Sequence, residues 1–116
     1  MNEQILIDAG IDYEGGLRRC AGNAGLYEHL LEMFLGDTSF EEAQQSMADK
    51  DYKELFSHVH EIKGMSGNMS ITDVYETSSN VVALLRAEDY DAIPQAFDEM
   101  KAAYGKAVSA IEKARG

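Results

Sequence analysis

The chain has 116 residues, of which 45% are hydrophobic and 27% are charged, a composition typical of one water-soluble domain. It contains 21 Asp and Glu residues against 10 Lys and Arg residues, for a formal net charge of −11. Because nucleic acids and anionic membranes attract clustered cations, this balance argues against DNA, RNA or an anionic lipid surface as a partner. With no linker-like segment, we expect a single domain over residues 1–116.

Three features of the chain predict a cytoplasmic location. Cys20 is the single cysteine and cannot form an internal disulfide, which fits a reducing compartment. No run of about 18 apolar residues is present to span a bilayer. The first residues lack the basic stretch and the long apolar segment of a secretory signal.

The first half of the chain shows helical periodicity, with apolar residues recurring every three or four positions. A short first helix is predicted near residues 13–21, ending at Gly22. Asn23 is a suitable cap for the next helix. The apolar positions of that helix are Leu26, Tyr27, Leu30, Leu31 and Phe34. They do not continue in phase to Phe40, which predicts a break near Gly36 and a new start at a Thr38–Glu41 capping box.

Three further helices are predicted in the second half. Asp51 and Glu54 form a capping box before a helix that extends to about Asn68. Ser70 with Asp73 is a weaker capping pair before an apolar stripe over residues 71–85. The last helix follows Asp89 or Asp91, and Asp91 is the better cap because it places Pro94 in the first turn. Four helices of roughly 15–25 residues with short connections predict an all-α, antiparallel (up-down-up-down) four-helix bundle with a short additional N-terminal helix.

The helix over residues 51–68 contains two glycines, Gly64 and Gly67, each of which costs about 1 kcal/mol relative to Ala inside a helix. At 100° per residue, Leu55, Ile62, Met65 and Met69 share the core side, and His60 lies opposite. The positions within about 60° of His60 are Lys53, Phe56, Ser57, Lys63, Gly64 and Gly67. This face is typical of a docking surface around one histidine, in which the glycines expose the ring and an exposed Phe56 adds an apolar contact.

A purely structural interpretation also accounts for these residues. A surface histidine beside a lysine is common, and glycine in a helix can serve close packing between helices. His58 points about 160° away from His60, toward the edge of the core, and is interpreted as a partly buried packing residue. His29 has no partner in the sequence and receives no role.

The segment from His60 to Met69 (HEIKGMSGNM) resembles the signature of the histidine phosphotransfer (HPt) domain family: His, two residues, Lys, Gly and then a small residue. The resemblance extends over roughly residues 5–112. The flanking positions that fit are Gly16-Leu17, Leu26-Tyr27 with Leu30, Leu31 and Phe34, Asp51-Tyr52, and Leu85-Arg86 with Asp89. Two positions depart from the family pattern: Ser70 stands where Gly is frequent, and Met65 where a smaller residue is frequent.

The resemblance implies that His60 accepts a phosphoryl group from an aspartyl phosphate and passes it to an aspartate on another protein. A histidine with its ordinary pKa near 6.5 is largely neutral at pH 7 and keeps a free lone pair. Lys63 would favour the neutral ring and stabilise the phosphoryl oxygens, with a modest effect because we expect it to be well exposed. Gly64 would give steric access and Gly67 would widen it, while Lys53, Phe56 and Ser57 would help to dock the partner.

The implied partners are receiver domains of response regulators and an upstream hybrid sensor kinase. No nucleotide-binding or metal-binding motif is present, so we expect a phosphocarrier rather than an enzyme, with no cofactor of its own. Nothing in the sequence indicates a dimer, and we expect a monomer. The receiver would supply Mg²⁺.

Three alternatives stay open. A non-transferring adaptor or inhibitor would keep the bundle and lose the chemistry. A chemotaxis-type domain would receive its phosphoryl group from a linked kinase. A di-metal bundle needs paired Glu-x-x-His motifs, and only one incomplete set occurs, around His58.

Overall fold

The computed structural model describes residues 1–116 and consists of helices joined by short connections. Its only extended pairing is an isolated antiparallel bridge between Ile11 and Ile71. The elements in chain order are α1 (Glu3–Asp8), α2 (Tyr13–Arg19), α3 (Ala24–Leu35), α4 (Ser39–Asp49), α5 (Tyr52–Asn68), α6 (Thr72–Arg86), the 3₁₀-helix η1 (Tyr90–Ala92) and α7 (Ile93–Arg115).

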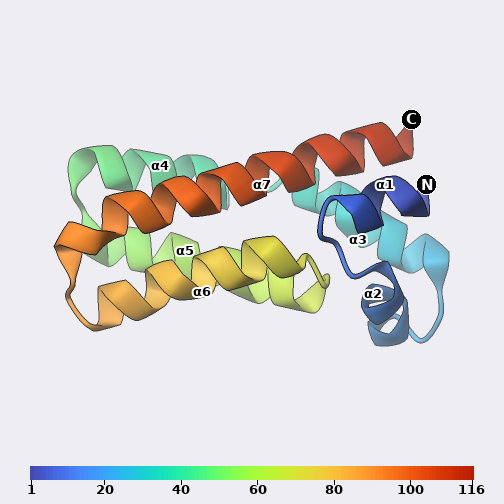
Figure 1. Cartoon of the computed structure of the whole chain (residues 1–116), viewed down its shortest axis with the longest axis horizontal. Helices are drawn as coiled ribbons and strands as arrows, with labels where there is room; N and C mark the ends of the chain where they lie inside the picture. The colour runs from blue at the N-terminus through green and yellow to red at the C-terminus, as the bar shows by residue number, and fades with distance from the viewer.

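Helices α4, α5, α6 and α7 form a four-helix bundle. In Figure 1, α4 and α7 form the upper layer, α5 and α6 form the lower layer, and α7 runs along the length of the molecule. Helices α1, α2 and α3 gather at the opposite end, where both chain termini also lie. The molecule is elongated, with principal extents of 40 × 24 × 20 Å. The prediction of an all-α antiparallel bundle is confirmed.

The N-terminal half differs in detail from the sequence prediction. The break near Gly36 is confirmed, but α3 and α4 have 12 and 11 residues, shorter than the 15–25 expected. Helix α2 corresponds to the predicted short helix. Helix α1 was not predicted, because six residues span fewer than two turns and leave no periodic stripe to detect.

Two predicted caps are confirmed. The side chain of Asn23 accepts a hydrogen bond from the backbone N–H of Leu26 (3.0 Å), and Asp51 accepts one from Glu54 (3.2 Å). The full capping box at Asp51 does not form, because its own N–H donates to the carbonyl of Ser46 (2.9 Å). Each cap satisfies a backbone donor that has no partner within the first turn of its helix.

The prediction of a Thr38–Glu41 capping box is wrong. Thr38 precedes α4 but its side chain makes no capping bond. Its hydroxyl donates to the carboxylate of Glu42 (3.2 Å), while Asp37 accepts the N–H of Ser39 (2.8 Å). The cap is thus supplied one position earlier than the motif suggests.

The caps predicted for the last two helices are also wrong. Ser70 has a φ of +58° and makes no capping bond to α6, because it forms the left-handed turn that reverses the chain after α5. Asp91 lies inside η1, and neither it nor Asp89 caps α7 with its side chain. Pro94 does occupy the first turn of α7, as expected.

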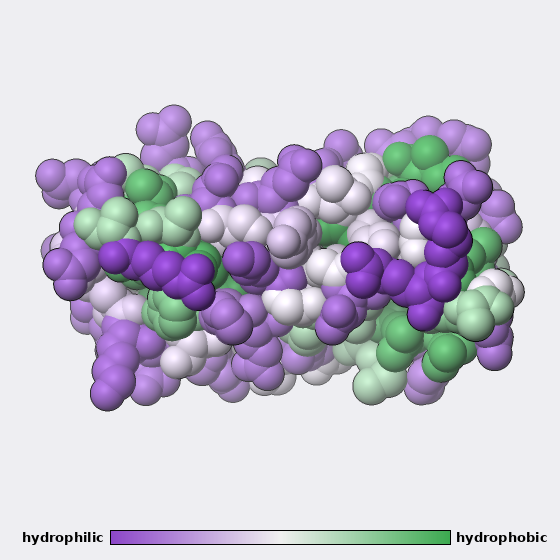
Figure 2. All heavy atoms as spheres, turned by 90° about the horizontal axis from the view of Figure 1, so that it is seen from below, coloured by the Kyte–Doolittle hydropathy of each residue, from purple (hydrophilic) through white to green (hydrophobic).

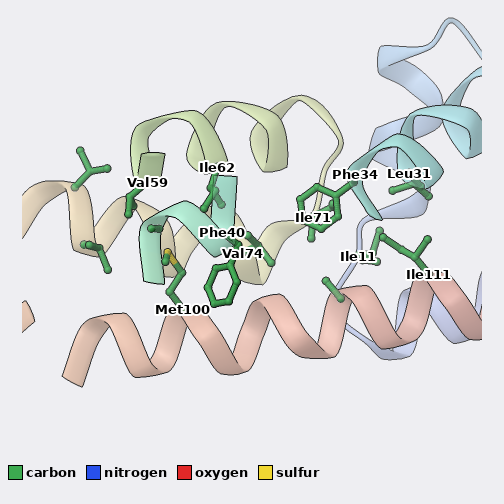
Figure 3. Close-up of a cluster of buried hydrophobic side chains, with 14 of the residues drawn as sticks. Ile11, Leu31, Phe34, Phe40, Val59, Ile62, Ile71, Val74, Met100 and Ile111 are labelled. Atoms are coloured by element: carbon green, nitrogen blue, oxygen red, sulfur yellow. The ribbon is translucent and has the colours of Figure 1, made fainter. Parts of the chain in front are cut away.

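One hydrophobic cluster of 23 buried residues holds the helices together. Figure 3 shows Val59 and Ile62 projecting from α5 into the bundle, where Phe40 of α4 and Met100 of α7 also point. The Phe40 ring stacks on Tyr104 of α7, with 4.3 Å between ring centroids. Side-chain stacking of this kind joins α4 to α7 across the bundle.

The N-terminal helices are attached to the α5–α6 turn by Tyr27 of α3. Tyr27 is fully buried, and its hydroxyl donates a hydrogen bond to the carbonyl of Met69 (2.7 Å). Burial raises the pKa of this hydroxyl well above its usual range, so the group stays protonated and remains a donor. Gly16 of α2 makes room for the ring, since a Cβ there would lie 2.0 Å from its Cζ atom.

We expect Gly16→Ala to lower the free energy of unfolding by about 2–4 kcal/mol, because the methyl group must displace a buried ring and strain its hydrogen bond. Gly105→Ala in α7 is the matched control. No atom lies within 4 Å of a Cβ at that position, so this variant should gain about 1 kcal/mol from helix propensity. Urea unfolding of both variants tests this, and equal stabilities would contradict the packing described for Gly16.

Candidate functional site

His60 lies beside a surface hollow of about 510 Å³ formed by α2, the second half of α5 and the start of α6. Figure 2 shows the α5–α6 face of the bundle, on which side chains of intermediate hydropathy lie between strongly hydrophilic groups. The residues that line the hollow are Asp12, Arg19, His60, Lys63, Gly64, Ser66, Gly67, Asn68, Ser70, Thr72 and Tyr75.

The position of His60 follows from the periodicity of α5. Leu55, Val59 and Ile62 are fully buried in the bundle, so the opposite side of the helix faces solvent and His60 is exposed. Ser66 also faces inward. Its hydroxyl donates to the carbonyl of Ile62 (2.8 Å), so this buried polar group has a hydrogen-bond partner. The helix therefore separates a packed face from an open one.

The imidazole ring of His60 rests on an aromatic neighbour one turn earlier. Phe56 and His60 stack with ring centroids 5.7 Å apart and an interplanar angle of 26°. The guanidinium of Arg86, at the end of α6, covers the Phe56 ring at 5.5 Å from its centroid. The expectation that Phe56 is exposed was wrong: it is half-buried and packs against the core. Its ring supports His60 rather than standing free.

The two glycines of α5 have different surroundings. A Cβ at Gly64 would meet no atom within 4 Å, so the surface beside His60 is open there. A Cβ at Gly67 would lie 3.1 and 3.2 Å from ring carbons of Tyr75 on α6. Gly67 therefore lines the hollow as expected, but the Tyr75 ring, and not open space, lies where its side chain would be.

The remaining predicted residues fall into two groups. Lys63 lines the hollow beside His60, and it is half-buried rather than well exposed as expected. Lys53 and Ser57 are exposed and line a second hollow with Phe56, on the other side of His60. The structure thus divides the predicted docking residues between two hollows, with the imidazole between them.

His58 occupies a different environment from His60. It is half-buried, and each ring nitrogen faces a carboxylate: Nδ1 lies 3.2 Å from Glu42 of α4, and Nε2 lies 3.6 Å from Glu54. Both nitrogens are thus engaged in contacts within the protein, and the residue links α5 to α4. His29 is exposed on α3.

Several residues beside the site were not predicted as functional. Asp12, Arg19 and Tyr75 line the hollow, and Arg86 covers Phe56. Arg86 and Phe56 lie 30 positions apart in the sequence, and only the packing of α6 on α5 brings them together. No local pattern predicts that Arg19 lines the same hollow as His60, because α2 reaches this place through the tertiary fold.

No group of three or more His, Cys, Asp or Glu side chains is arranged to hold a metal ion. None of the helices combines the length and the apolar composition that crossing a bilayer requires.

The model of the Hpt domain family matches residues 29–111. The match begins after α1 and α2, whereas the resemblance noted in the sequence extends from about residue 5. Comparison with curated proteins found no match, and neither did comparison with solved structures. Hpt domains serve in histidine phosphotransfer within phosphorelays, interact with the receiver domains of response regulators, and are phosphocarriers rather than catalysts.

We expect Gly64→Ala to raise the free energy of unfolding by about 1 kcal/mol, because the added methyl group meets no neighbour and alanine favours the helix. Gly67→Ala should gain clearly less or lose stability, because the Tyr75 ring must move. Urea unfolding of the two variants measures this difference. Equal gains would show that Tyr75 does not pack against the glycine.

Proposed function

Because the chain belongs to the Hpt domain family, we propose that it is a histidine-containing phosphotransfer protein whose phosphoacceptor is His60. It accepts a phosphoryl group from the aspartyl phosphate of one receiver domain and passes it to an aspartate of another. The single observation that carries this assignment is the exposed imidazole of His60 beside Gly64, where no atom would meet a Cβ within 4 Å. A receiver's active-site loops can approach the ring at this place.

The transfer step uses the unprotonated nitrogen of the His60 ring. Its lone pair forms the N–P bond as the P–O bond to the aspartyl carboxyl breaks, and the electron pair of that bond stays on the carboxylate. Onward transfer reverses these events with a second aspartate as the nucleophile. Charge gathers on the three phosphoryl oxygens during the step, and the Lys63 ammonium in the same hollow is placed to stabilise it.

In this proposal Phe56 positions the nucleophile. No hydrogen bond or ion pair within the chain holds the His60 ring, whereas the stack on Phe56 covers one of its faces. The cation–π contact with Arg86 holds Phe56 in turn and is worth roughly 0.5–1 kcal/mol at an exposed site. A ring with one face covered loses less rotational freedom when the receiver binds.

His58 is the rival phosphoacceptor on the same helix. Attack on an aspartyl phosphate needs a free ring nitrogen and room for a partner, and His58 is half-buried between Glu42 and Glu54. Those carboxylates would also repel an approaching phosphoryl group. The geometry around His58 therefore favours a packing role.

Several parts of the proposal concern partners outside this chain. We place Mg²⁺ on the receiver, because such a cation neutralises the developing charge on the phosphoryl group. The phosphoryl group would originate on an upstream hybrid sensor kinase, and the relay would operate in the cytoplasm with this chain as a monomer. A non-transferring adaptor would have no need for an open surface beside His60.

We expect the wild type to acquire acid-labile, alkali-stable label from a phosphorylated receiver domain in the presence of Mg²⁺, and His60→Gln to acquire none. The matched control is His58→Gln, which should keep the label because its ring is not the nucleophile. Incubation with radiolabelled receiver followed by gel analysis measures both. Label that persists on His60→Gln and disappears from His58→Gln would move the site to the other histidine.

We expect Lys63→Ala to slow transfer at saturating receiver by about 3- to 10-fold, roughly 0.7–1.4 kcal/mol of transition-state stabilisation, without changing the fold. Lys106→Ala on α7 removes the same charge at a residue that does not line the hollow, and it should leave the rate unchanged. Single-turnover kinetics and thermal unfolding of both variants test this. A fall of many degrees in the midpoint for Lys63→Ala would instead assign this lysine a structural role.

A further inference from the structure

Helix α2 lies outside the region matched by the family model, yet it forms one wall of the hollow beside His60. Its contribution to that wall includes Arg19, an exposed residue in its last turn. The face of a phosphotransfer domain around its histidine is the face that a receiver must cover. An additional element at its edge can therefore influence which receivers bind.

The position of α2 is set by contacts with the α5–α6 turn. The backbone N–H of Asp12 donates to the carbonyl of Ser70 (2.9 Å), and Ile11 pairs with Ile71 in the isolated bridge. The hydrogen bond from Tyr27 to the carbonyl of Met69 attaches α3 to the same turn. These bonds cross between segments about 40–60 positions apart, and they attach the start of α2 to the turn that follows α5.

The charge of the hollow is opposite in sign to that of the protein. The chain has a net charge of −11, but the hollow contains the cations Arg19 and Lys63 against a single carboxylate, Asp12. That carboxylate caps α2 by accepting the N–H of Gly15 (3.0 Å). Arg19 and Lys63 form no ion pair within the chain, so their charges are available to a partner.

We propose that α2 is a partner-selecting element, in which Arg19 contacts a carboxylate on the rim of the receiver's active site while His60 receives the phosphoryl group. This inference rests on the proposed function. Receivers whose rim is acidic at that place would dock more tightly than receivers that are neutral or basic there. Arg19 acts on docking, whereas Lys63, which is half-buried beside His60, acts on the phosphoryl group.

Arg18 provides a matched control on the same helix. It neighbours Arg19 and is also exposed, but it does not line the hollow and its guanidinium faces Glu14 at 3.8 Å. Substitution of either arginine changes the net charge of the protein by the same amount. A difference in receiver binding between the Arg18 and Arg19 variants therefore depends on where the charge lies and not on the net charge.

The experiment uses the full chain phosphorylated on His60 with phosphoramidate, and a receiver domain that accepts the phosphoryl group from the wild type in the presence of Mg²⁺. Transfer rates are measured against receiver concentration at low and moderate salt. We expect Arg19→Gln to raise the half-saturating receiver concentration about 2- to 5-fold and Arg19→Glu about 10-fold, with a weaker dependence on salt. The rate at saturation should stay within about twofold, and Arg18→Glu should resemble the wild type.

Two results would overturn the inference while leaving the proposed function intact. If Arg18→Glu and Arg19→Glu changed the half-saturating receiver concentration equally, the change would come from the overall charge of the protein. A changed rate of phosphohistidine hydrolysis in Arg19→Gln without any receiver would place Arg19 on the phosphoryl group instead of the partner. Failure of the wild type to transfer to any receiver would refute the proposed function itself. Restoration of Arg19→Glu docking by an Asp→Lys or Glu→Lys change on the receiver would identify the contact directly.

Discussion

Burial of one face of α5 is the constraint from which the geometry around His60 follows. Leu55, Val59 and Ile62 are fully buried, and a helix with that apolar stripe has one orientation in the bundle that removes it from water. His60 and Gly64 then face solvent because they lie on the opposite side of the same cylinder. Each buried aliphatic side chain contributes about 1.5–3 kcal/mol, so the three together outweigh the roughly 1 kcal/mol that an exposed helical glycine costs.

The proposed phosphotransfer site consists of few parts. The chain supplies an exposed ring, an aromatic support beneath it and cations around it, while no cluster of carboxylates is arranged to hold a metal. Four of the ten Lys and Arg residues are found at this face. In a protein of net charge −11, this placement gives the proposed docking surface a local sign opposite to that of the whole, which favours acidic partners and orients their approach.

The N-terminal helices show how an addition to a bundle becomes part of its site. Helix α2 precedes the matched region, and bonds between the residues at its start and the α5–α6 turn hold it in place. Gly16 and Tyr27 fit together at this junction, where the absence of a side chain on one residue makes room for the ring of the other. The same contacts place Arg19 at the edge of the hollow. The packing of α2 and the proposed selection of partners therefore depend on one set of contacts.

The errors at the site share a physical cause, whereas the error in the cap of α4 is local. The caps at Asn23 and Asp51 were predictable because each depends on atoms within three residues. The cap at Thr38 was wrong because Asp37 competed for the same role. The prediction that Phe56 is exposed was wrong because Arg86 covers its ring from another helix. The prediction for Gly67 did not foresee that the Tyr75 ring, also from another helix, packs against this glycine. Angles around a single helix contain no information about what a neighbouring helix places over it.

The sequence by itself determined the helical fold class, the break near Gly36 and the side of α5 on which His60 lies, because these depend on periodicity and on contacts a few residues apart. Only the tertiary structure decided that Phe56 supports the ring, that Lys63 is half-buried and that α2 brings Arg19 to the hollow. Those features depend on how helices distant in the chain pack together, and a one-dimensional pattern does not record that packing.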